Sequence, residues 1–178
     1  MSKLEVDAIE PQSGTTLTIG ASGDTITVPS GATITNSGTA TGFGKILQVS
    51  DMAIISSTQA VATTTYTDLT GFNISITPSS TSSKIFMCAN IETHAPSNPR
   101  GYGLKFFRNT TEIYGSGQLY SIFYISTSER QIASWNYIDS PNTTSSTTYK
   151  VQVATYNGDS LNFNQGSQST FYLMEIAG

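Results

Sequence analysis

From residue 45 to the C-terminus, short runs of alternating apolar and polar residues are interrupted by turn-forming residues at intervals of about ten. A chain broken this often has no room for long helices, and no segment shows the spacing of apolar residues that is typical of a helix. The 178 residues include 25 serines, 27 threonines and 15 glycines, which suit pleated strands and tight turns. These features predict an all-β protein.

The alternating runs of residues 45–178 predict a two-sheet β-sandwich, most simply a jelly roll that forms a single head domain. Two connections between them resemble hairpin turns: Asn109-Thr110-Thr111 and, more strongly, Asn157-Gly158. The predicted strands are Ile46–Ser50, Thr63–Thr67, Phe72–Ile76, Lys84–Glu92, Gly103–Arg108, Glu112–Tyr114, Gln118–Ile125, Gln131–Ile138, Tyr149–Tyr156, Ser160–Asn164 and Thr170–Ile176.

Residues 15–44 contain a degenerate repeat, in which TLTIGASGD (16–24) is followed by TITVPSGA (25–32) and TITNSG (33–38). Each unit is a four-residue strand pattern followed by a corner rich in Gly and Ser, as in β-solenoids and intertwined β-shafts. Because side chains alternate along a strand, one face collects the apolar ones. These are Leu17, Ile19, Ile26, Val28 and Ile34. The segment is therefore predicted to be a β-shaft, and the competing interpretation is a disordered linker.

A single copy of this segment cannot be stable, because burying so few apolar side chains does not offset the entropy of ordering about thirty backbone residues. Identical chains wound about a common axis would bring the apolar faces together and share their backbone hydrogen bonds. We therefore predict an intertwined shaft in a homotrimer with threefold cyclic symmetry.

Residues 1–14 form a short segment in which Leu4, Val6 and Ile9 alternate with charged residues, before Pro11 and Gly14 end the pattern. Such a peptide can add a strand to the edge of another protein's sheet. A frayed terminus is an equally good interpretation. The first alternative makes Leu4, Val6 and Ile9 attachment residues.

Composition argues against several functions. The net charge is −4 with no run of Lys or Arg, which disfavours nucleic acid, and no apolar run is long enough for membrane insertion. One Cys and one His provide no metal site, and Cys88 is predicted to be a buried thiol. No nucleophile, phosphate-binding or metalloprotease motif is present, and no carboxylate pair stands out by its spacing. We expect no enzymatic activity, no catalytic residues and no cofactor.

Aromatic residues are concentrated between residues 102 and 156, where tyrosine predominates. Tyrosine combines an apolar ring with a hydroxyl group, which suits exposed contact surfaces as well as cores. The segment with Pro96 and Pro99 predicts a long loop, and its neighbours His94, Arg100 and Tyr102 are the candidate contacts with a host receptor.

The opening LEVDAIEPQSG (4–14), followed by the TLTI, TITV and TITN units, resembles the N-terminal region of tail-fibre and other virion proteins of marine tailed bacteriophages. The head segments ITPSSTSSKI (76–85), FRN (107–109), YIDSP (137–141), TTYK (147–150) and LMEI (173–176) are similar to the C-terminal heads of such fibres, which resemble trimeric jelly rolls of the C1q and tumour-necrosis-factor type.

This resemblance implies a virion protein whose N-terminal segment binds other virion proteins and whose head faces outward. A trimeric tail fibre would adhere through its head to a host surface glycan or protein. A capsid decoration protein or head fibre would need the same three parts for a structural role. The shaft, about thirty residues long, is shorter than in typical fibres. A position on the tail and a position on the capsid therefore both stay open.

Overall fold

The computed structural model describes residues 9–37, 45–96, 100–115, 122–125 and 129–178. The chain forms two units, Met1–Phe43 and Gly44–Gly178, and the second is called the head below. Leu4 and Val6, two of the predicted attachment residues, lie outside the described residues.

In the N-terminal unit, residues 9–37 contain turns and no strand. Two corners of the repeat form as expected, since the amide of Asp24 donates to the carbonyl of Ala21 and that of Ala32 to the carbonyl of Pro29, both at 3.1 Å. The third corner, at Gly38, lies outside the described residues. Gly23 and Gly31 have positive φ angles of 94° and 88°, which are easy only for glycine. All five apolar side chains of the predicted shaft are 42–63% exposed in the single chain. The β-shaft itself stays a prediction.

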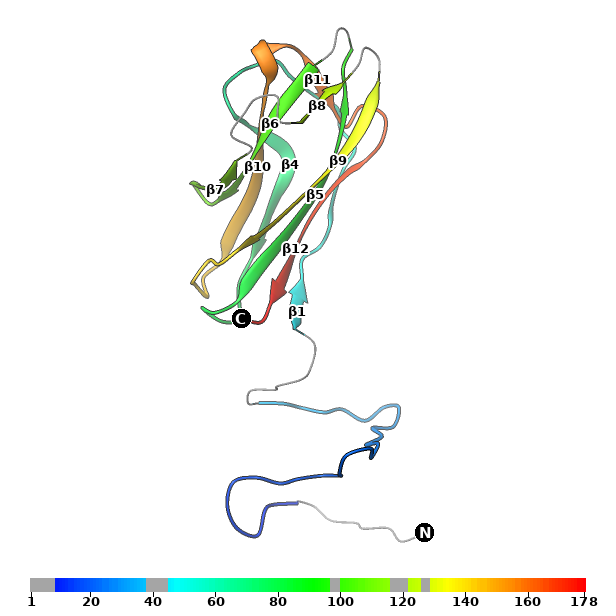
Figure 1. Cartoon of the computed structure of the whole chain (residues 1–178), viewed down its shortest axis with the longest axis vertical. Helices are drawn as coiled ribbons and strands as arrows, with labels where there is room; N and C mark the ends of the chain where they lie inside the picture. Colours follow the sequence, from blue (N-terminus) through cyan, green and yellow to red (C-terminus); the bar gives the residue numbers. More distant parts are fainter. Residues whose placement is uncertain (1–8, 38–44, 97–99, 116–121, 126–128) are drawn as a thin grey trace. The chain divides into compact units, whose positions relative to one another are not determined.

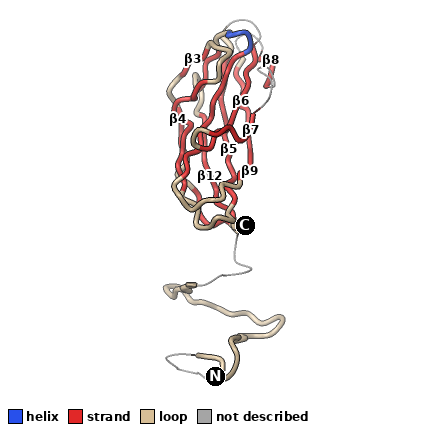
Figure 2. The backbone as a smooth tube through the Cα atoms, turned by 90° about the vertical axis from the view of Figure 1, so that its left-hand side faces the viewer, coloured by secondary structure: helices blue, strands red, loops and turns tan. Residues whose placement is uncertain are grey.

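The head is a sandwich of two antiparallel sheets, so the prediction of an all-β sandwich is confirmed (Figures 1 and 2). The seven-stranded sheet contains β1 (Ile46–Val49), β2 (Ala53–Ile55), β3 (Gln59–Val61), β5 (Lys84–His94), β9 (Arg130–Asp139), β11 (Leu161–Phe163) and β12 (Ser169–Ile176). The five-stranded sheet contains β4 (Thr67–Ile76), β6 (Arg100–Arg108), β7 (Thr111–Gly115), β8 (Ile122–Ile125) and β10 (Thr147–Thr155).

The order of the strands is that of a jelly roll, in which the chain crosses repeatedly from one sheet to the other. In the seven-stranded sheet, β12 and β11 pair with successive parts of one side of β5, and β9 pairs with its other side. In the second sheet, β10 lies between β4 and β6. β1 and the C-terminus lie at one end of the head and β8 and β11 at the other, which we call the far end (Figure 1).

The core lies between the sheets, and strict alternation in the long strands puts every second side chain into it. The ring of Phe171 from β12 packs against Phe72 of β4 and Phe106 of β6, with centroids 6.2 and 6.4 Å apart. The largest buried side chains are Tyr102, Tyr149, Phe72, Phe106, Phe163 and Phe171. These aromatic contacts hold the two sheets together.

A polar cluster also joins the sheets. Arg108 of β6 donates to both carboxylate oxygens of Asp139 on β9, at 3.1 and 2.9 Å. The hydroxyl of Tyr149 on β10 donates to the same carboxylate at 2.7 Å. Asp139 is buried, and burial together with this carboxylate raises the pKa of Tyr149 well above its usual value.

Two local predictions differ from the structure and one agrees. The hairpin at Asn109 is confirmed, because β6 and β7 pair across it and Asn109 has a φ of 53°. Asn157-Gly158 is not a hairpin turn: it lies in a short 3₁₀ segment, η1 (Tyr156–Gly158), and connects β10 to β11 in the other sheet. Of the predicted strand Thr63–Thr67, only Thr67 is in a strand, and the short strands β2 and β3 were not predicted.

Candidate functional site

The outward face of the seven-stranded sheet carries an apolar row that crosses four strands in register. Val49 of β1 pairs with Met174 of β12, Met174 pairs with Phe86 of β5, and Phe86 pairs with Ile138 of β9. Directly paired residues point to the same face of a sheet. Their chain neighbours Ile85, Met87 and Leu173 are buried in the core, so the row points outward. Val49 is 56% exposed and Ile138 is 51% exposed.

Apolar side chains extend this row on both sides. Ile46 pairs with Ile176, and the exposed Ile54 pairs with Thr170. Ile132 of β9 is also exposed. Large apolar patches on a protein surface mark sites of contact with another molecule.

The two rows of paired residues between the apolar row and the far end are polar and uncharged, whereas the row on its other side pairs Ile176 with the charged Lys84. One of the two polar rows consists of Tyr172, Cys88 and Asn136, and Cys88 is buried as predicted. In the next, Asn90 donates to Thr170 at 3.0 Å and accepts from Ser134 at 2.6 Å. Because these side chains satisfy one another and carry no charge, a second molecule can cover them without leaving an ion buried and unpaired.

The outward face of the five-stranded sheet is different. Lys150 pairs with Asp68 at 3.0 Å, and Gln152 donates to the same carboxylate at 2.7 Å. Although burial raises the pKa of Asp68, these hydrogen bonds and the charge of Lys150 outweigh it and keep the pKa below its usual value. Lys105 pairs with Glu112 and lies over the ring of Tyr66, 4.5 Å from its centroid. A sheet face covered by paired charged and polar side chains is typical of a surface that contacts water.

No group of three or more metal-ligating side chains is found in the part of the chain that the structure describes. No helix among the described residues is long and apolar enough to cross a membrane.

Of the three predicted receptor contacts, the prediction for Tyr102 is wrong. Tyr102 is fully buried, with its ring edge-on to Phe163 at 5.2 Å, and burial raises the pKa of its hydroxyl. Arg100 begins β6, and its side chain is not among those described. His94 ends β5 and is half-buried, paired with Arg130 of β9 and Asn162 of β11. Tyr102, Leu104 and Phe106 alternate along β6, and all three face the core. The alternation is present in the sequence, but the prolines that precede it led to the prediction of a loop.

Of the predicted attachment and shaft residues that are described, Ile9, Leu17, Ile19, Ile26, Val28 and Ile34 are all exposed. Nothing in the single chain covers them, and their roles stay predictions. The apolar row was missed because its four members come from strands far apart in the sequence, and each strand alone shows only ordinary alternation.

No protein family and no curated protein matches this sequence. Its structure is similar to that of VP2 from infectious bursal disease virus in a subviral particle. That match has 14% identity and a TM-score of 0.50, and covers 74% of this chain and 33% of VP2. The likeness is one of fold.

A second match, from T=1 particles derived from infectious bursal virus, has 12% identity and a TM-score of 0.44, over 73% of this chain and 36% of the other. The present chain thus spans about one third of the length of these proteins.

Proposed function

We propose that this protein is a homotrimeric structural protein of a bacteriophage virion, a tail fibre whose head adheres to the host surface. The observation that carries the proposal is the exposed apolar row of Val49, Met174, Phe86 and Ile138, together with its uncharged neighbours. A free monomer would expose this surface to water, whereas packing it against other copies would bury it. The resemblance of residues 4–38 to phage fibre shafts and the fold similarity to a viral particle protein support the virion role.

The occupant of the apolar face is a copy of the same chain. β1 carries Val49 and begins at Ile46, directly after the repeat whose apolar side chains also need a partner. Two adjoining segments of one chain therefore expose apolar surface, and association of identical chains buries both. Because the apolar row and the two polar rows next to it carry no charge, copies that meet over them do so without like-charge repulsion.

Sedimentation equilibrium of the full chain tests the association. We expect a mass three times that of the 19.0 kDa chain. Ile138→Asp places a charge at the β9 end of the apolar row and should shift the equilibrium toward monomers by at least about tenfold. Ser75→Asp is the matched control, because Ser75 is exposed on the other sheet, and it should leave the mass unchanged. A monomeric wild-type protein at micromolar concentration would refute the trimer.

The virion role is tested separately. Antibodies against the head, applied to purified particles of the phage that encodes this sequence, should label them in electron micrographs. Labelling at the tail tip supports the fibre. The second candidate function, capsid decoration or a head fibre, is favoured by the fold similarity to a protein of a subviral particle, and predicts labelling of the capsid surface instead. Unlabelled particles would exclude both functions.

A further inference from the structure

A polar groove lies at the far end of the head, where β11 ends and β12 begins. One wall is the connection between β2 and β3, with Ser56 and Thr58, and the other is the loop after β11, called the 164–168 loop. The groove has a volume of about 300 Å³. Its lining is formed by Ser56, Thr58, Asn164, Gln165, Gly166, Ser167 and Gln168, all of them uncharged.

A buried carboxylate holds the 164–168 loop in place. Glu92 of β5 is only 1% exposed, yet it points to an otherwise solvent-facing loop. Its Oε2 accepts the backbone amide of Gln165 at 2.7 Å, and its carbonyl accepts that of Asn164 at 3.1 Å. The amide of Glu92 donates to the hydroxyl of Ser169 at 2.8 Å. A buried carboxylate is costly unless it is paired, so these contacts, two to the 164–168 loop and one to Ser169 at the start of β12, indicate that the loop conformation matters.

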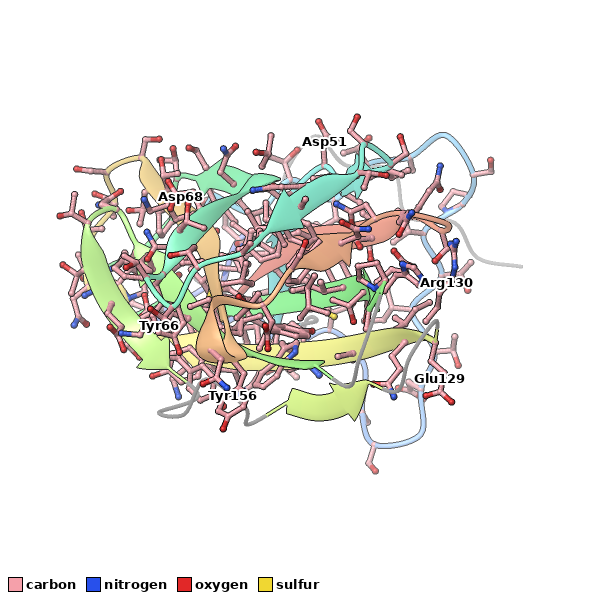
Figure 3. The ribbon with its side chains drawn as sticks, turned by 90° about the horizontal axis from the view of Figure 1, so that it is seen from above. Asp51, Tyr66, Asp68, Glu129, Arg130 and Tyr156 are labelled. Atoms are coloured by element: carbon pink, nitrogen blue, oxygen red, sulfur yellow. The ribbon has the colours of Figure 1, made fainter. Side chains whose placement is uncertain are left out.

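Arg130 completes this support. Its Nη1 lies 3.8 Å from Oε1 of Glu92, and its guanidinium group lies directly over Gly166, where a Cβ atom would come within 1.0 Å of Nη1. A side chain at this position would displace the guanidinium group from its place beside Glu92. Figure 3 looks onto this end of the head and shows Arg130 on the opposite side of the sandwich from Tyr66 and Asp68.

The two walls of the groove are also joined to each other. Asn164 is 2% exposed and has a φ of 61°. Its Nδ2 donates to the carbonyl of Ser57 at 3.3 Å, and the hydroxyl of Thr58 donates to the carbonyl of Asn164 at 3.4 Å. The Oδ1 of Asn164 has no hydrogen-bond partner among the described residues, so an acceptor at the groove lacks a donor. The groove is therefore formed before any ligand arrives, which lowers the entropy cost of binding.

We propose that this groove binds the hydroxyl groups of a neutral glycan. Amide and hydroxyl side chains both donate and accept hydrogen bonds, as sugar hydroxyls do. The residues that line the groove carry no charge and the nearby guanidinium group of Arg130 is paired with Glu92, so a neutral sugar is favoured over an acidic one, and no aromatic ring lines the groove as a stacking surface. Affinity at one site is therefore modest, about millimolar. Three linked copies would raise it through avidity.

This inference rests on the proposed adhesion to a host surface and names the site and ligand class. β1, which follows the shaft, begins at the opposite end of the head from β11 (Figure 1). If residues 1–14 attach the protein to the virion, the far end of the head stays free to contact a cell.

Saturation-transfer NMR on the full-length protein provides the test. The probes are oligosaccharides of dextran, galactan and mannan as neutral ligands, with sialyllactose and oligogalacturonate as acidic ones. We expect transfer to at least one neutral probe. The double variant Gln165→Ala with Gln168→Ala removes two amide side chains from the groove and should weaken this binding at least about fivefold. Asn73→Ala removes an exposed amide from β4 on the other sheet and should leave it unchanged.

Binding of acidic probes alone, binding of no probe, or binding that survives the double variant would each overturn the groove assignment. Sedimentation and particle labelling are measured independently of sugar binding. If they succeed while the sugar test fails, the virion role stands without this site. If they fail while sugar binding is lost in the double variant, the groove stands and the virion role falls.

Discussion

The buried carboxylate of Glu175 binds polar groups at the turn between β4 and β5. Glu175 of β12 is fully buried and accepts hydrogen bonds from the backbone amide and the hydroxyl of Ser79, at 2.7 and 2.6 Å, and from the side chain of Gln48. Burial alone would raise the pKa of Glu175, but the hydrogen bonds from Ser79, Ser83 and Gln48 outweigh it and keep the pKa below its usual value. The carboxylate thereby fixes the turn between β4 and β5.

This depressed pKa makes the stability depend on pH. As the pH falls below about 5, the carboxyl group of the unfolded chain takes up its proton before that of the folded chain. The contribution of Glu175 is therefore complete near neutral pH and is lost as the pH falls through its folded pKa. Urea unfolding between pH 7 and pH 3 should show a smaller loss of stability for Glu175→Gln than for the wild type. Parallel curves for the two proteins would show that Glu175 is not responsible.

Asp139 differs from the exposed Asp68, although each accepts hydrogen bonds from two side chains. Asp139→Ala leaves the hydroxyl of Tyr149 buried without its acceptor and Arg108 without its counter-ion, and should lower the free energy of unfolding by about 3 kcal/mol. The matched control Asp68→Ala breaks a solvent-exposed pair with Lys150 and should cost at most about 1 kcal/mol. Both values come from chemical denaturation, and equal losses would contradict the role assigned to burial.

At the scale of elements, the shaft and the sheets obtain their stability in different ways. β5 pairs along its whole length with β9 on one side, and with β12 and β11 on the other. The shaft segment has turns but no strand partner in the single chain. We predict that this segment takes its β structure from other copies of the chain.

A synthetic peptide of residues 15–44 should accordingly be disordered in water, because even three such chains cannot offset the entropy of ordering without the head to hold them together. Far-UV circular dichroism at micromolar concentration should show no β signal. The full chain, measured alongside, provides the folded reference. A β spectrum from the isolated peptide would show that the repeat folds by itself and would remove the argument for the trimer that rests on its instability.

At the scale of the whole molecule, attachment and assembly are predicted to be separate functions of separate segments. Deletion of residues 1–14 removes Leu4, Val6 and Ile9 and leaves the apolar row of the head intact. The truncated protein should remain a folded trimer in sedimentation experiments but should not be incorporated into particles. Incorporation is measured by mass spectrometry of particles purified from cells that produce only the truncated chain.

A matched substitution at the other end separates the two functions. Gln168→Ala changes an exposed residue of the groove and should leave incorporation unchanged. If the truncated protein is still incorporated, or if the Gln168→Ala protein is not, the N-terminal segment does not attach the chain to the virion.

Much of the fold could be predicted from the sequence because its determinants are local. Alternation along β10 and β12 predicted which side chains enter the core, and Asn109 predicted the hairpin between β6 and β7 through its tolerance of a positive φ. The glycine corners at Gly23 and Gly31 follow from the same property of the backbone. Patterns of two to ten residues were enough for each of these predictions.

Only the tertiary structure decided which strands are neighbours. Asn157-Gly158 has the sequence of a hairpin turn, yet the strands on either side of it belong to different sheets: β10 pairs with β4 and β6, and β11 pairs with β3 and β5. Tyr102 was predicted to be an exposed contact and is a core residue. The apolar row and the groove each join segments separated by many residues. Local patterns determine the direction of each side chain within its strand, whereas the pairing of distant strands determines the surface to which it contributes.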